Sequence, residues 1–216
     1  MTPRYDCVSL PHRPHLGHER ALWVNGALWV AGIDEAGRGP LAGPVVAAAV
    51  VLPQMKVPAL GLGGVRDSKK MSAAQRESWT AAIREIAVTY AVGQASAQEI
   101  DTLGIVPATR LAAGRAVQAL AVCPDYLLLD YLQLPEVPIP QVSLIKGDMR
   151  SLSIAAASVL AKTNRDAVLV ELDGIYPAYG FSQHKGYGTK AHLEAIRALG
   201  PSPVHRMSFA PLRIGV

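Results

Sequence analysis

The alternation of apolar runs with polar, glycine-rich breaks predicts a domain that mixes strands and helices. Five apolar runs have the length and the β-branched content of strands. They span residues 27–33, 45–52, 88–95, 126–129 and 142–145. Because helical segments alternate with strands after the second run, we expect an α/β fold built on a mixed sheet.

Five other segments have helical signals. Ser72 with Gln75, and Ser96 with Glu99, have the spacing of a capping box, in which the first and fourth residues bond each other's backbone. The first half of segment 151–172 is almost entirely apolar, so we expect that helix to be buried. The predicted helices are 72–86, a short one from residue 96, 107–122, 151–172 and 189–199, the last of which ends at Gly200.

These elements suggest one domain with an extension before it. Residues 1–26 are rich in Pro, His and Arg and show no sustained period, so we expect an N-terminal extension. Residues 27–216 then form a single domain, and from about residue 174 its C-terminal part is expected to be helical.

Composition favours a folded protein in the cytoplasm. Half of the 216 residues are apolar and 18% are charged, which argues against disorder. The longest apolar run, 45–52, is far shorter than the about 20 residues of a membrane span, and we expect no membrane association and no signal peptide. Two cysteines make neither a disulfide framework nor a zinc site, and Cys123 is expected to be buried.

The charge is unevenly distributed. The chain has 21 Lys and Arg against 17 Asp and Glu, a formal net charge of +4. Residues 176–216 hold five basic residues and one acidic residue, so this segment carries the whole excess. A basic segment on a neutral body suggests an anionic partner, although +4 is also ordinary for this length.

Four acidic residues stand where strands end. Asp34 and Glu35 follow the first apolar run, Asp130 closes the fourth and Asp148 follows the fifth. Sites of open α/β sheets form at strand ends, and carboxylate oxygens suit Mg²⁺ or Mn²⁺. Clustered carboxylates repel unless cations lie between them, and two such cations catalyse phosphodiester hydrolysis. Taken singly, each acid is better explained as a helix cap or a surface charge, so the prediction depends on their joint placement.

A glycine turn follows the first two acids. Gly37-Arg38-Gly39 is not a dinucleotide fingerprint, because it leads into a strand rather than a helix. The turn either brings backbone N–H groups close to a sugar or phosphate, or is simply a tight hairpin.

Several motifs together resemble bacterial ribonuclease HII, the type 2 ribonuclease H. They occur in the family's order over about residues 28–211. They are Gly32-Ile-Asp-Glu-Ala-Gly-Arg-Gly-Pro, Asp67-Ser-Lys-Lys, Lys146-Gly-Asp, Ile154-Ala-Ala-Ala-Ser-Val-Leu-Ala-Lys, Tyr176-Pro-Ala-Tyr-Gly-Phe-Ser-Gln-His-Lys-Gly-Tyr-Gly-Thr and Gly200-Pro-Ser-Pro-Val-His-Arg.

The resemblance implies a ribonuclease H-like fold, a five-stranded mixed sheet flanked by helices with a C-terminal helical part. It implies an endonuclease that uses Mg²⁺ or Mn²⁺ and acts in DNA replication and ribonucleotide excision repair. Its expected substrates are RNA–DNA hybrids and duplex DNA with single embedded ribonucleotides. Cleavage is expected 5′ of the ribonucleotide, leaving a 3′-hydroxyl and a 5′-phosphate.

The resemblance also assigns site residues. The four catalytic, metal-binding acids are Asp34, Glu35, Asp130 and Asp148. Gly37, Arg38 and Gly39 form the loop that senses the RNA–DNA junction, and Tyr187 is the ring that stacks on the junction sugar. A 2′-hydroxyl on the next sugar would hinder this ring, which selects DNA there.

Other polar residues in the motifs are weaker candidates. His184 is expected to contact substrate, His205 to be structural and Asp166 to be an ion-pair partner. Each candidate phosphate contact could instead belong to a structural ion pair. The candidate phosphate contacts are Lys69, Lys146, Lys162, Arg165, Lys185 and Arg206.

The sequence departs from the family pattern at two positions, and three alternative functions remain. Tyr131 stands where the family usually has Gly, and Gly104 where it often has Asn, so rate or substrate preference could differ. One alternative is a ribonuclease HIII-like enzyme, which has an additional N-terminal domain. The others are a non-catalytic hybrid-binding protein and a junction resolvase. We expect a monomer.

Overall fold

A computed structural model describes residues 10–55, 61–65, 68 and 71–213. The strands are β1 Val30–Ala36, β2 Val45–Val51, β3 Thr89–Ala95, β4 Tyr126–Asp130 and β5 Gln141–Leu144. The α-helices are α1 Gly17–Val24, α3 Ala73–Ile86, α4 Ala97–Leu103, α5 Ile105–Gln118, α6 Leu152–Ile175, α7 Phe181–His184 and α8 Lys190–Leu199. Short 3₁₀ turns cover Gly147–Met149 and Pro177–Tyr179. None of the described helices is long and apolar enough to cross a membrane.

The five strands form one mixed sheet in the order β3-β2-β1-β4-β5, which confirms the predicted fold class. β1 is central. It pairs with β2 in antiparallel and with β4 in parallel orientation, and β4 pairs in parallel with β5. The parallel register places Ile33 opposite Leu129. The residues that follow them, Asp34 and Asp130, therefore emerge at the same edge of the sheet.

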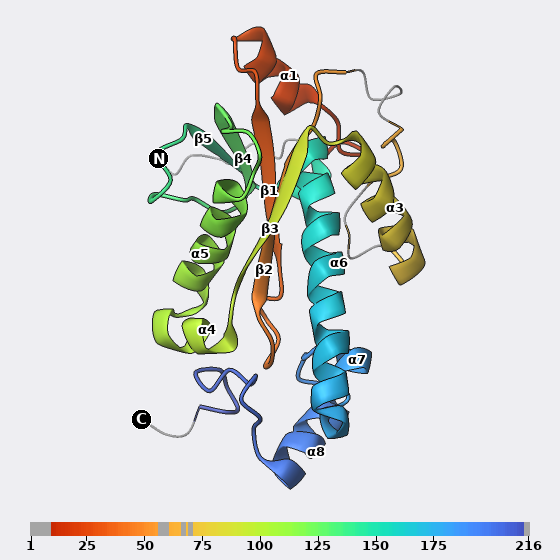
Figure 1. Ribbon diagram of the computed structural model, residues 1–216, viewed down its shortest axis with the longest axis vertical. Coiled ribbons are helices and arrows are strands. Elements are labelled where there is room, and N and C mark those ends of the chain that lie inside the picture. The colour runs from red at the N-terminus through yellow and green to blue at the C-terminus, as the bar shows by residue number, and fades with distance from the viewer. Residues whose placement is uncertain (1–9, 56–60, 66–67, 69–70, 214–216) are drawn as a thin grey trace, which may run out of the picture.

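Helices cover both faces of the sheet. Figure 1 shows α4 and α5 on one face and α6 with α3 on the other. The helices approach the sheet so closely that glycine is needed at two points. A Cβ on Gly32 would lie 2.2 Å from the carbonyl carbon of Ser153 in α6. A Cβ on Gly93 would lie 2.2 Å from the Ala112 carbonyl oxygen in α5. As predicted, the first half of α6, residues 152–161, is buried throughout.

Local signals set most helix boundaries. Both predicted capping boxes form, Ser72 with Gln75 and Ser96 with Glu99. Gly104 joins α4 to α5 with φ +84 and ψ 159, a region that essentially only glycine adopts. Cys123 is exposed in the turn before β4, so the prediction that it is buried is wrong. The reason is that α5 ends at Gln118, before the apolar run does.

The end of the predicted extension packs onto the domain. Leu16 belongs to the core, and Glu19 in α1 is completely buried. The Glu19 carboxylate accepts hydrogen bonds from the Ser151 hydroxyl (2.6 Å) and from the Ser153 hydroxyl and amide (2.7 and 2.9 Å). α1 is thus attached to the start of α6, although its sequence has no clear helical period.

The C-terminal part contains helices, as predicted, and lies at the far end of α6 (Figure 1). Phe181 is fully buried there among aromatic rings. The rings of Tyr179, His192 and His205 lie 5.4, 5.5 and 5.6 Å from it, centroid to centroid. Burial, and second the charge of His192, lowers the pKa of His205 to about 4.

Replacing Glu19 by Ala should destabilise the fold. The change leaves the buried Ser151 and Ser153 donors without their acceptor, so we expect a loss of about 2–4 kcal/mol in the free energy of unfolding. Urea denaturation measures it. Glu85→Ala, an exposed site in α3, is the control and should change stability by no more than about 0.5 kcal/mol. An equal effect of both substitutions would show that α1 does not anchor the fold.

Acid should destabilise the protein through His205. Its folded pKa of about 4 lies below the unfolded value of 6.5, so the unfolded chain binds the extra proton between these pH values. Stability contributed by neutral His205 is complete above pH 6.5 and falls as the pH drops to about 4, by roughly 2 kcal/mol. Urea denaturation as a function of pH should show a shallower slope in His205→Gln than in the wild type. Parallel curves would contradict this origin of the acid sensitivity.

Candidate active site

Three of the four predicted acids meet at the shared edge of β1 and β4. Asp34 is buried in β1, Glu35 follows it and Asp130 is the last residue of β4. Beyond Ile33, β1 pairs with β2 but no longer with β4, and both Asp34 and Glu35 line the cavity that opens there.

Asp148 lies beside this group rather than in the lining of the cavity. It is buried in the 3₁₀ turn Gly147–Met149. The Gly147 amide donates a hydrogen bond of 2.7 Å to Asp130 Oδ1, which joins this turn to the end of β4. The fold thus brings all four acids to one edge of the sheet.

The carboxylates repel one another. The pKa of Asp34 is raised well above its usual value, first by burial and then by the charges of Glu35 and Asp130. Hydrogen bonds from the Ser158 side chain and the Glu35 amide (2.8 Å) oppose this shift. A divalent cation would relieve the repulsion, since hard cations bind carboxylate oxygens.

The donor set fits a metal, although it is not in a ligating arrangement here. Within the described ranges, no three His, Cys, Asp or Glu side chains are placed to hold a metal ion. Glu35 Oε1 instead accepts from Arg38 Nη1 at 3.0 Å. Asp34, Glu35, Asp130 and Asp148 are the residues that would hold a metal, and Arg38 would have to share or release Glu35.

The cavity at this edge has a volume of about 410 Å³ and gathers most of the predicted site. Acids, the glycine turn, one lysine and the predicted stacking ring all contribute to its wall. The lining residues are Asp34, Glu35, Ala36, Gly37, Arg38, Gly39, Ser68, Asp130, Tyr131, Ser158, Lys162, Arg165 and Tyr187.

The glycine turn is held from behind by a buried arginine. Arg206 donates from Nη2 to the Gly37 carbonyl (2.6 Å) and from Nη1 to the Arg38 carbonyl (3.0 Å). In a trans peptide the C=O and the following N–H point in opposite directions. Because these carbonyls face Arg206, the amides of Arg38 and Gly39 face away from it.

Arg165 supports the same region. Gly37 has φ +93, and a Cβ there would lie 1.9 Å from Arg165 Nε, so only glycine fits. Arg165 donates to three main-chain carbonyls, those of Ala42, Pro44 and Lys185. Arg165 and Arg206 are almost completely buried, so the prediction that they contact phosphates is corrected. Their donors bind the protein's own backbone.

Tyr187 lies next to the glycine turn. Its side chain is about half exposed and lines the cavity, and a Cβ on Gly39 would lie 4.0 Å from its Cε1 atom. The loop before it is tight, because a Cβ on Gly186 would lie 2.6 Å from the Ala42 carbonyl oxygen. The two predicted recognition elements are therefore neighbours in space.

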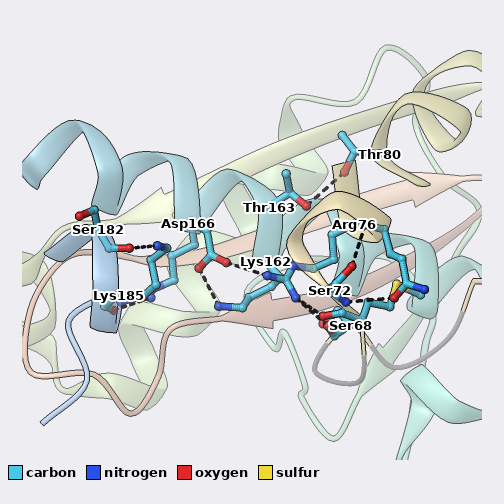
Figure 2. Close-up of polar contacts among 12 residues, drawn as sticks. Ser68, Ser72, Arg76, Thr80, Lys162, Thr163, Asp166, Ser182 and Lys185 are labelled. Atoms are coloured by element: carbon cyan, nitrogen blue, oxygen red, sulfur yellow. Dashed lines mark hydrogen bonds and ion pairs between the residues drawn. The ribbon is translucent and has the colours of Figure 1, made fainter. Parts of the chain in front are cut away.

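Lys162 is held by a polar network along α6 (Figure 2). Its ammonium group is 2.6 Å from Asp166, which also pairs with Arg76 at 3.3 Å. Burial lowers the pKa of Lys162. Asp166 is thus the ion-pair partner that the sequence predicted, and Lys162 is the predicted phosphate contact that lines the cavity.

The other predicted contacts are placed differently. Lys185 donates to the Ser182 carbonyl and lies outside the cavity lining, as does exposed Lys146. Both ring nitrogens of His184 bond the main chain, at Tyr179 and Gly186, which corrects its assignment as a substrate contact. Lys69 lies outside the described residues.

Besides Ala36, three lining residues were not predicted as site residues, namely Ser68, Tyr131 and Ser158. Ser158 bonds Asp34, and its hydroxyl is 2.9 Å from that of Ser68. Ser158 lies within the matched motif of α6, but nothing in that motif distinguishes it as polar support for an acid. Tyr131 is 74% exposed at the rim with φ 48, which explains why glycine is usual there.

Comparisons with known proteins identify the family of this chain. The family model described as Ribonuclease HII matches residues 31–212. The chain is 54% identical over 198 residues to ribonuclease HII of Desulfitobacterium hafniense (strain Y51), covering 92% of this chain and 75% of that one. It is 52% identical over 202 residues to ribonuclease HII of Myxococcus xanthus (strain DK1622), covering 93% and 68%.

Solved structures share the fold. Ribonuclease H2 of Pyrococcus horikoshii OT3 matches with a TM-score of 0.72 and 25% identity, over 86% of this chain and 95% of that one. Bst-RNase HIII in complex with Mn²⁺ matches with a TM-score of 0.64 and 21% identity, over 87% and 69%, a likeness of fold. The family model and the curated relatives decide between the two types. The chain belongs to the ribonuclease HII family, whose members are metal-dependent endoribonucleases that cleave the RNA of RNA–DNA hybrids.

Proposed function

We propose that this protein cleaves RNA–DNA hybrids, and duplex DNA 5′ of a single embedded ribonucleotide, leaving a 3′-hydroxyl and a 5′-phosphate. One observation carries the proposal. A buried carboxyl group, Asp34, is close enough to two further carboxylates to be affected by their charges, in the same cavity as the glycine turn and Tyr187. Hydrolytic and recognition groups therefore face one substrate, and we propose that a monomer suffices.

Asp34, Glu35, Asp130 and Asp148 are the proposed ligands of Mg²⁺ or Mn²⁺. When bound, two such cations supply an activated water and stabilise the charge on the departing 3′-oxygen. Ser158 holds Asp34, and the Gly147 amide holds Asp130, so the chain orients two of the four carboxylates through hydrogen bonds of its own.

The glycine turn is the proposed reader of the ribose. The turn lines the cavity, and the amides of Arg38 and Gly39 face away from Arg206 because it holds the neighbouring carbonyls. A 2′-hydroxyl can accept a hydrogen bond from such an amide, whereas a deoxyribose cannot. Lys162, fixed by Asp166, is placed to meet a backbone phosphate.

Tyr187 is the proposed reader of the next sugar. Its ring is partly exposed beside Gly39, so a nucleotide read by the turn has its neighbour at the ring. A ring packed on a deoxyribose leaves no room for a 2′-hydroxyl, which favours DNA on that side of the cut.

Cleavage assays on matched duplexes test the function. With Mg²⁺ or Mn²⁺ we expect cuts in an RNA–DNA hybrid and in a duplex with one ribonucleotide, but none in all-DNA duplexes or four-way junctions. Binding of the hybrid without turnover would instead favour a non-catalytic protein, and cleavage of four-way junctions a resolvase.

Asp34→Asn should abolish cleavage while the protein stays folded. The substitution removes a proposed metal ligand but also relieves the repulsion from Glu35 and Asp130. Loss of a residue that only supports a metal ligand costs up to about 100-fold in activity, so we expect loss of a ligand itself to cost at least about 100-fold. Thermal stability should be kept or raised. Glu171→Gln, an exposed site in α6, should retain full activity. Retained activity or unfolding of Asp34→Asn would contradict the assignment.

Tyr187→Ala should weaken discrimination at the junction. We expect the preference for a ribonucleotide followed by DNA, over one followed by RNA, to fall on the order of tenfold, the size of an aromatic stacking contribution. Tyr187→Phe keeps the ring and should keep the preference. The ratio of kcat/KM on the two duplexes measures it, and an unchanged ratio in Tyr187→Ala would exclude the proposed role.

A further inference from the structure

Two buried histidines connect the C-terminal segment to the backbone of Tyr187. The Ser202 amide lies 2.9 Å from His205 Nδ1, and the Nε2 atoms of His205 and His192 are 3.0 Å apart. His192 Nδ1 lies 2.9 Å from the Tyr187 carbonyl oxygen. A continuous chain of hydrogen bonds therefore runs from Ser202 to Tyr187.

The backbone groups at the two ends of this hydrogen-bond chain determine which atom donates in each bond. A backbone amide can only donate, so His205 Nδ1 accepts and its proton is on Nε2. A carbonyl can only accept, so His192 Nδ1 carries the proton and donates to Tyr187. His205 Nε2–H is then left to donate to the bare Nε2 of His192. Both tautomers follow from the backbone groups at the two ends.

The chain requires both rings to be neutral. A second proton on His192 would sit on Nε2 and place two N–H groups face to face across the 3.0 Å contact. A second proton on His205 would sit on Nδ1 and face the Ser202 amide N–H, 2.9 Å away. Burial favours the neutral form, because His192 is fully buried and His205 is 2% exposed. The ring of His184 stacks on that of His192 at 4.3 Å and, if charged, would oppose a further charge there.

Arg206, which follows His205 in the sequence, holds the other proposed recognition element, the glycine turn. His205 leads through His192 to Tyr187, and Arg206 donates directly to the carbonyls of Gly37 and Arg38. The Arg206 amide also donates to the Leu41 carbonyl (2.8 Å), which fixes this dipeptide between the two elements. One rigid dipeptide therefore sets the spacing between the glycine turn and Tyr187.

We propose that His205 and His192 are positioning residues that hold Tyr187 at a fixed distance from the glycine turn and so set discrimination at the RNA–DNA junction. This inference rests on the proposed function of Tyr187. Neither histidine touches substrate. Loss of the hydrogen-bond chain should release the Tyr187 carbonyl and weaken the discrimination between deoxyribose and ribose. The rate of cleavage of the preferred duplex should change less.

Two substitutions at one position separate positioning from packing. In His192→Asn the amide nitrogen takes the place of Nδ1 and can still donate to the Tyr187 carbonyl, whereas His192→Leu fills the space without a donor. We expect His192→Leu to reduce the preference for DNA after the ribonucleotide by about 3- to 10-fold, the value of one hydrogen bond. His192→Asn should stay within about twofold of the wild type.

Ile83→Ala, on the buried side of α3 in the core that α3 shares with α6, is the stability control. It should lower the melting temperature without moving the preference. An unchanged preference in His192→Leu, or an equal loss in Ile83→Ala, would overturn the proposal. A wild type that cleaves both duplexes equally would overturn the role of Tyr187 itself, and the positioning role with it.

Long-range ¹H–¹⁵N NMR of the wild-type protein tests the chain without activity. Near pH 7 we expect His205 protonated on Nε2 alone and His192 on Nδ1 alone. The opposite tautomer of either ring, or a doubly protonated ring, would exclude the chain even if the variants behaved as expected.

Discussion

The proposed recognition elements, the glycine turn and Tyr187, depend on two buried guanidinium groups that bind backbone carbonyls. Arg165 and Arg206 are 1% and 0% exposed, and each donates three hydrogen bonds to the main chain. Burial, and second the charge of Arg165, lowers the pKa of Arg206 to about 9. Two like charges are kept out of water because no other side chain could bind so many carbonyls at once. The carbonyls belong to Gly37, Arg38, Ala42, Gly43, Pro44 and Lys185.

The placement of the proposed catalytic acids depends on the sheet. Parallel pairing of β1 with β4 sets Ile33 against Leu129, so Asp34 and Asp130 follow at one edge without any loop to place them. Their mutual repulsion is a cost that the fold accepts, and a bound cation would remove it. The acids therefore lie on rigid strands, while the glycine turn and Tyr187 lie on loops made rigid by buried arginines.

Sequence patterns predicted the features that are local in the chain. Strand runs and the two capping boxes are short-range signals, and acids directly after apolar runs could be placed at strand ends. Features that depend on distant contacts were not predictable in this way. In the sequence alone, Arg206 resembles a phosphate contact. The fold brings it into contact with the carbonyl of Gly37, which lies 169 residues earlier in the chain. Glu19 is held by α6, 132 residues further on, and no period within α1 reveals this.

The central claim is that one cavity both reads a ribose and hydrolyses the bond on its 5′ side. Mapping the cut at nucleotide resolution in a duplex with a single embedded ribonucleotide, with and without chelator, tests it most directly. We expect one cut 5′ of the ribonucleotide, with 3′-hydroxyl and 5′-phosphate ends, and none with the metal removed. Cleavage on the 3′ side, a 2′,3′-cyclic phosphate, or activity that survives chelation would contradict it.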